Sequence, residues 1–100
     1  MTFEEMKNEI FSFVYLTTTT CNVCKILQPK LRELAENYKE ATFHEILMDE
    51  QPEAKGFFMA FAVPTFIVYS EGQEILRTAR HITVDESRNT LDRYYGMIMN

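Results

Sequence analysis

The sequence has no tryptophan, and glycine and proline number only three each among 100 residues. So little Gly and Pro excludes a collagen-like or low-complexity chain, and a hydrophobic content of 46% excludes an intrinsically disordered one. Apolar runs of the length that spans a membrane, about 20 residues, are also missing. No internal repeat or linker divides the chain. We therefore expect a single domain over residues 1–100 with no membrane partner.

Clusters of basic residues are absent as well. The ten Lys and Arg residues are scattered and the net charge is −5, whereas a nucleic-acid surface needs Lys and Arg gathered together. Residues 1–9 are acidic and amphipathic, without the basic start and small-residue cleavage site of a secretory signal. We therefore expect a cytoplasmic, monomeric protein with no nucleic-acid partner.

Hydrophobic periodicity predicts helices that alternate with strands. Apolar positions three and four residues apart are typical of helices, and short runs of β-branched and aromatic residues indicate strands. The expected order is helix, strand, helix, strand, helix, strand, strand, helix, over residues 2–9, 11–16, the segment after Cys21, 42–48, 51–61, 65–69, 74–79 and the segment after Thr83. The strands at 11–16 and 42–48 are interpreted as buried.

The order of these elements predicts the fold class. A strand, a crossover helix and a second strand give a right-handed parallel pair, and the turn at residues 70–73 makes the last two strands an antiparallel hairpin. The fold is therefore expected to be α/β, a mixed four-stranded sheet flanked by helices on both faces. Pro29 lies inside the second helix and should kink it. The expected packing residues include Ile26 and Leu31 in the second helix, Phe57, Phe58 and Phe61 in the third, and Leu91 and Ile98 in the last.

The two cysteines, Cys21 and Cys24, stand where a strand has ended and a helix begins. Free backbone N–H groups and the helix dipole favour a thiolate there, so Cys21 is expected to attack first. A thiol three residues later lies on the inner side of the same turn, so Cys24 is expected to resolve the mixed disulfide. Two other interpretations are a chance pair of buried cysteines and half of a zinc site. A zinc site would need a second pair of ligands, and His44 and His81 are single residues. We therefore expect no metal site.

Further motifs give the sequence a resemblance to the thioredoxin family. Cys21-Asn22-Val23-Cys24-Lys25 followed by Pro29 matches the family's Cys-x-x-Cys-Lys with its kinking proline, and Val63-Pro64-Thr65 matches the segment that carries a cis-proline. The spacings from Cys21 to Pro64 and from Pro64 to Gly72 also agree. The resemblance covers nearly the whole chain, except that the usual first strand is absent. It implies a thioredoxin-like fold, a cis Pro64 facing Cys21, and a Val63 backbone that pairs with extended substrate.

The sequence departs from ordinary thioredoxins around this motif. Thr20 takes the place of the family's Trp, and Asn22 and Val23 replace Gly-Pro. The family's buried Asp corresponds to Tyr15 and its Lys partner to Glu45, so Glu45 is a candidate proton acceptor for Cys24. Arg80 replaces a Gly before the last helix, where it narrows the substrate groove or adds positive charge. A solvated Glu45 and a plain surface Arg80 are the alternative interpretations.

These features predict a thiol-disulfide oxidoreductase that reduces protein disulfides. It needs no bound cofactor, and an upstream reductant such as a thioredoxin reductase would recycle it. One alternative is a redox-inert or redox-sensing binding module on the same fold, since a fold does not fix a function. The other is a glutaredoxin-like reductase of low-molecular-weight mixed disulfides.

Overall fold

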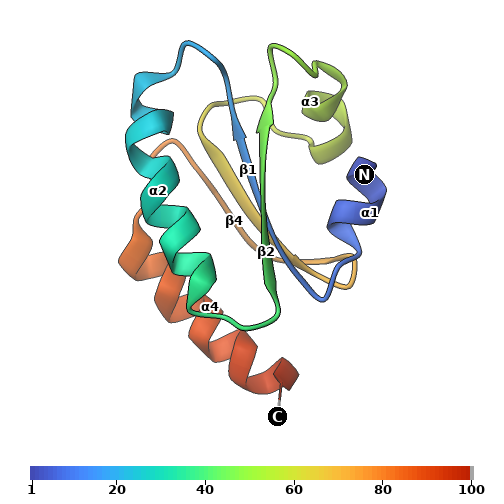
Figure 1. The fold of residues 1–100 in the computed structure, drawn as a ribbon, viewed down its shortest axis with the longest axis vertical. Coiled ribbons are helices and arrows are strands. Elements are labelled where there is room, and N and C mark those ends of the chain that lie inside the picture. The colour runs from blue at the N-terminus through green and yellow to red at the C-terminus, as the bar shows by residue number, and fades with distance from the viewer. Residues whose placement is uncertain (100) are drawn as a thin grey trace.

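The structure, a computed structural model, describes residues 1–99, with side chains described for residues 1–97. Helices and strands follow each other in the predicted order (Figure 1). The elements are α1 (Phe3–Lys7), β1 (Phe11–Thr17), α2 (Asn22–Glu36), β2 (Ala41–Leu47), α3 (Glu53–Phe58), β3 (Thr65–Ser70), β4 (Gln73–Ala79) and α4 (Val84–Met99). Helix α2 continues through Pro29 without a break. Among the described residues, α1 leads directly into β1 and no strand precedes it.

The four strands form one mixed sheet in the order β2-β1-β3-β4. β1 runs parallel to β2 and antiparallel to β3, and β4 runs antiparallel to β3. Helices α2 and α4 cover one face of the sheet, and α1 and α3 cover the other (Figure 1). The predicted α/β fold class is confirmed.

These strand directions bring four connections to one end of the sheet. The C-terminal ends of β1, β2 and β4 meet the N-terminal end of β3 there, because β3 alone runs in the opposite direction. Cys21, Asp49, Pro64 and Arg80 lie in the connections that leave or enter these strand ends. Residues distant in the sequence are therefore neighbours at this end.

Each face of the sheet has its own core. Alternate side chains of β1 point to opposite faces, so Phe11, Phe13 and Tyr15 pack with α2 and α4 while Val14 and Leu16 pack with α1 and α3. All five are fully buried. Burying each such large apolar side chain stabilises the fold by roughly 1.5–3 kcal/mol.

The structure corrects several packing predictions. β2 is an edge strand, and only Ile46 in it is fully buried, so the prediction of a buried strand was wrong. Ile26, Phe57 and Phe61 are 67%, 42% and 68% exposed rather than packed in the core. Helix α3 ends at Phe58, three residues early, because the next residue adopts a left-handed backbone. The side chain of Ile98 lies outside the described residues.

Candidate active site

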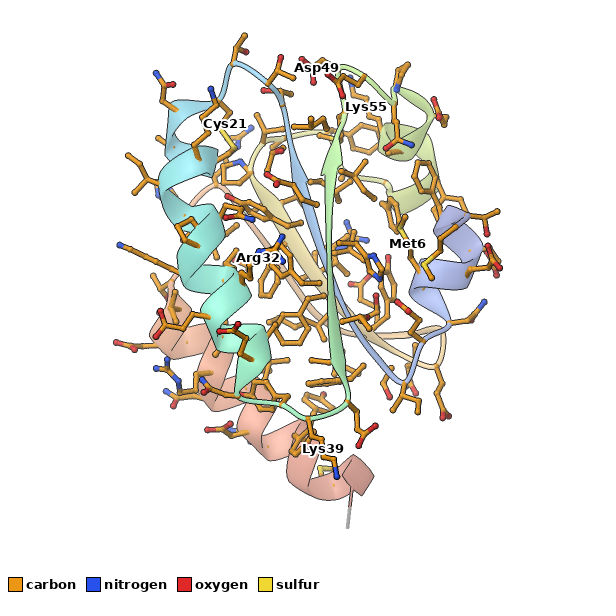
Figure 2. All side chains as sticks on the ribbon, in the orientation of Figure 1. Met6, Cys21, Arg32, Lys39, Asp49 and Lys55 are labelled. Atoms are coloured by element: carbon orange, nitrogen blue, oxygen red, sulfur yellow. A yellow bond between two sulfur atoms is a disulfide. The ribbon has the colours of Figure 1, made fainter. Side chains whose placement is uncertain are left out.

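The two cysteines lie where β1 finishes and α2 starts. β1 ends at Thr17, residues 18–20 form a short loop, and Cys21 is the N-cap residue of α2. The sulfurs of Cys21 and Cys24 form a disulfide whose Cα atoms are 5.3 Å apart (Figure 2). Cys24 is 1% exposed, whereas Cys21 is only partly buried. Cys21 is therefore the more accessible of the two residues.

The start of α2 favours negative charge on Cys21. The Cys21 Sγ accepts a hydrogen bond from the Cys24 backbone N–H at 3.2 Å, which satisfies one of the free donors of the first turn. That turn contains no acidic residue, and Lys25 follows Cys24. Both the N–H donors and the helix dipole stabilise a thiolate relative to a thiol. In the reduced protein, this position therefore favours the thiolate form of Cys21.

Asp49 anchors the loop that precedes Cys21. The Thr19 backbone N–H donates to both carboxylate oxygens of Asp49 at 3.2 Å, and the Thr19 hydroxyl also donates to this carboxylate. The bond from the Thr19 hydroxyl lowers the pKa of Asp49, and the Thr19 backbone N–H adds to the effect. The sequence predictions missed Asp49, although an acid directly after a strand parallel to β1 was an available clue.

The Val63–Pro64 peptide bond is cis, as the resemblance implied. Val63 and Cys21 are both partly buried and pack against the core that contains Cys24. The carbonyl oxygen of Pro64 accepts a hydrogen bond from the Arg80 backbone N–H at 2.9 Å. Arg80 has a left-handed backbone with φ of 66° and an exposed side chain. The structure therefore brings Cys21, Cys24 and Val63 into one cluster and joins Arg80 to it through Pro64.

Three predicted contact residues surround the accessible cysteine. Thr20, Asn22 and Val23 are all exposed, and they are adjacent to Cys21 or lie between the two cysteines. None of them is needed for the core, so their side chains are free to meet a partner.

The comparisons with known proteins identify the fold family. The sequence pattern of the thioredoxin family matches residues 2–93. The chain belongs to the thioredoxin family. The thioredoxin-like protein YdfQ of Bacillus subtilis is 31% identical over 92 residues, which are 92% of this chain and 82% of that protein. Thioredoxin 1 of Thermosipho africanus superposes with a TM-score of 0.80 at 31% identity, over 88% of this chain and 98% of that one.

Another relative matches over a shorter stretch. Thioredoxin H7 of Arabidopsis thaliana is 34% identical over 61 residues, which are 61% of this chain and 47% of that protein. Thioredoxin membership and the bonded Cys21–Cys24 pair together support a thiol-disulfide oxidoreductase in general terms.

Tyr15 lies beneath the turn that carries the two cysteines. It is fully buried, and its hydroxyl donates to the carbonyl oxygen of Cys24 at 2.8 Å. Burial, with a contribution from the negative charge of Glu45, raises the pKa of Tyr15 to about 12. The phenol therefore remains neutral at physiological pH, so it orders the cysteine turn but cannot take up a proton.

Glu45 lies beside Tyr15 on the same face of the sheet. The two residues are paired in the register of β1 and β2. Glu45 is exposed, and its Oε2 accepts a hydrogen bond from the buried Thr17 hydroxyl at 3.4 Å. The carboxylate is thus close enough to affect the ionisation of Tyr15, whose hydroxyl touches the Cys24 backbone. Its role as proton acceptor stays a prediction.

Arg77 fixes the end of α3, and the sequence predictions missed it. Its guanidinium donates to the carbonyl oxygens of Phe58 and Met59 at 2.8 and 3.2 Å. The same group binds both carboxylate oxygens of Glu74 at 2.9 and 3.1 Å. The chain continues from Met59 to the cis peptide bond between Val63 and Pro64. This contact from β4 therefore holds the start of the loop that leads to Pro64.

The histidines do not gather with other metal ligands. Within residues 1–99, no three His, Cys, Asp or Glu side chains form a group that could hold a metal ion. His44 Nε2 lies 2.5 Å from Glu9 Oε1. His81 is exposed in the loop after β4. A search of the described helices finds none with the length and apolar character needed to cross a membrane.

Proposed function

We propose that the protein reduces disulfide bonds of protein substrates through Cys21 and Cys24. The observation that carries this proposal is the placement of the pair, with Cys21 capping α2 at the accessible side and Cys24 buried one turn behind it. Thioredoxin membership supports the same chemistry. The reaction needs no bound cofactor, and an upstream reductant such as a thioredoxin reductase returns the protein to the dithiol form.

The reaction consists of two thiol–disulfide exchanges. The Cys21 thiolate attacks one sulfur of the substrate disulfide, that S–S bond breaks, and the departing substrate thiolate takes a proton from solvent. Cys24 then loses its proton and attacks the Cys21 sulfur, which breaks the mixed disulfide and releases the second substrate thiolate. Two electrons pass to the substrate, and the Cys21–Cys24 disulfide remains.

The residues around the disulfide have separate roles in this proposal. The Val63 backbone pairs with an extended substrate segment, and Pro64 shapes the loop that holds Val63. Glu45 accepts the proton that Cys24 loses in the second step. The side chains that contact substrate are Thr20, Asn22, Val23 and Arg80.

Reduction of insulin disulfides by dithiothreitol tests the proposal. The wild-type protein should accelerate the reaction, and Cys21→Ser should not. Cys24→Ser should accumulate a mixed disulfide with the substrate, because the resolving thiol is missing. If the wild-type protein gives no acceleration over the uncatalysed control, the protein is a binding or redox-sensing module instead.

A parallel assay separates protein disulfides from small mixed disulfides. Reduction of a glutathione mixed disulfide should be slow compared with reduction of insulin at equal protein concentration. The reverse order would favour the glutaredoxin-like alternative.

A further inference from the structure

A groove near the disulfide combines exposed apolar side chains with basic ones. It has a volume of about 340 Å³ and lies between α2 and the loop that follows β4. Its apolar lining includes Val23, Ile26 and Leu27. Val23 and Ile26 are 61% and 67% exposed. Two branched apolar side chains that contribute little to the core are therefore presented to solvent next to the cysteines.

Every ionisable side chain that lines this groove is basic, although the chain as a whole carries a charge of −5. These residues are Lys30, Arg80 and His81. The two acidic residues at the start of α4, Asp85 and Glu86, do not line this groove. Asp85 forms an ion pair with Arg88 at 3.1 Å, and Glu86 lines a neighbouring hollow beside β4 that meets the groove at Thr83. Lys30 and Arg80 thus give the groove two formal positive charges on an otherwise acidic protein.

The groove adjoins the site of the proposed reaction through Val23 and Arg80. Val23 lies between the two cysteines, and the Arg80 backbone N–H binds the carbonyl oxygen of Pro64. A substrate segment whose cysteine reaches Cys21 therefore presents its neighbouring residues to this groove, because extended chain advances only about 3.3 Å per residue.

We propose that the groove selects protein disulfides in which a cysteine lies within a few residues of both an apolar side chain and an aspartate or glutamate. The inference rests on the proposed function and names its substrate class. The apolar side chain packs on Val23 and Ile26, which removes exposed apolar surface from water. The carboxylate lies against Arg80 and Lys30, where complementary charge raises the association rate and suppresses cationic partners.

Three synthetic peptide disulfides test this selection. They are identical except for one residue near the cysteine, which is Glu, Gln or Lys. Single-turnover reduction by the reduced wild-type protein should be about three- to tenfold faster for the Glu peptide than for the Gln peptide, and slowest for the Lys peptide. The differences should shrink at about 1 M salt, where the screening length falls to about 3 Å.

Substitutions in the groove test whether it causes the preference for the Glu peptide. Lys30→Gln and Arg80→Gln, separately and together, should bring the Glu to Gln rate ratio toward one. Lys39→Gln is the matched control, because it removes the same charge at the end of the molecule opposite Cys21 (Figure 2). It should leave the ratio at its wild-type value.

The outcomes distinguish the two proposals. Equal rates for all three peptides, or a preference that survives in the Lys30→Gln/Arg80→Gln double variant, would overturn the selection while the reductase function stands. Failure to reduce any peptide or insulin would overturn the proposed function, and the selection with it.

Discussion

The buried phenol of Tyr15 contacts the backbone of Cys24, the proposed resolving cysteine. Its hydroxyl donates to the Cys24 carbonyl oxygen at 2.8 Å, and its raised pKa keeps it neutral. A neutral donor holds the turn in place but offers no base. Glu45 is the carboxylate that acts on Tyr15 electrostatically, and it extends from the neighbouring strand on the same face. We therefore propose that Tyr15 orders the cysteine turn and that a different side chain, Glu45, accepts the proton.

Glu45→Gln tests the second assignment. We expect resolution of the mixed disulfide to slow by about tenfold or more, because positioned general bases contribute roughly 10²–10⁴-fold. The measurement is the single-turnover rate of the second step across a range of pH. Glu40→Gln is the control, since Glu40 is also exposed but precedes the opposite end of β2. A pH profile identical to that of the wild-type protein would remove Glu45 from the mechanism.

Tyr15→Phe tests the first assignment. Loss of the bond to the Cys24 carbonyl oxygen should lower the free energy of unfolding by about 1 kcal/mol in urea titrations. The phenol ionises near its ordinary value of 10 when unfolded but only at about 12 when folded. Its contribution to stability is therefore fully present below pH 10 and is lost as the pH rises toward 12.

The pH dependence supplies a second measurement on the same variant. Between pH 10 and 12 the free energy of unfolding should fall less steeply for Tyr15→Phe than for the wild-type protein. Equal slopes would mean that Tyr15 ionises alike in both states.

At the scale of elements, the site is assembled by contacts that cross between segments. Asp49, after β2, binds Thr19 in the loop before Cys21. Arg77, on β4, binds the last carbonyls of α3. Each of these side chains ties a segment near a strand end to an element that is distant in the sequence.

Arg77→Met should loosen the end of α3. Two backbone carbonyl oxygens lose a charged donor, so we expect a loss of about 1–2 kcal/mol in the free energy of unfolding. Amide exchange at Met59 and Ala60 should become faster, because both follow the released helix end. Arg93→Met, an exposed position on α4, is the matched control. Unchanged exchange at these amides would show that Arg77 does not hold this segment.

At the scale of the whole molecule, the sheet separates two cores that share its central strands. β1 and β3 send alternate side chains to both faces, so loss of either core exposes the other. We therefore predict that the described residues unfold as one cooperative unit, as expected for a single domain of this size.

Substitutions on opposite faces test this cooperativity. Ile67→Val, on the α3 face, should cost about 0.5–1.5 kcal/mol, and Leu91→Ala, on the α4 face, about 2–5 kcal/mol. In both variants, far-ultraviolet circular dichroism and tyrosine fluorescence should report the same urea midpoint. Two separate transitions in either variant would contradict a shared core.

Local patterns predicted the order of elements and the place of the cysteine pair, because both depend on residues close in the sequence. The strand directions in the sheet followed from the connections between those elements. Burial in β2 could not be predicted this way, since an apolar run does not show whether a strand is central or at an edge. Ile26 lies on the solvent-facing side of α2, and Phe61 follows the end of α3, so both are exposed. Arg77 reaches its carbonyl oxygens from β4, 18 and 19 residues away in the sequence. No periodicity records such distant contacts.

The gathering of all four site connections at one end of the sheet separates recognition from folding. The loops and the first residue of α2 carry the exposed side chains of Thr20, Asn22 and Arg80, whereas the strands beneath them hold the two cores. A combinatorial library confined to these exposed positions would therefore vary recognition while the packed core stays intact.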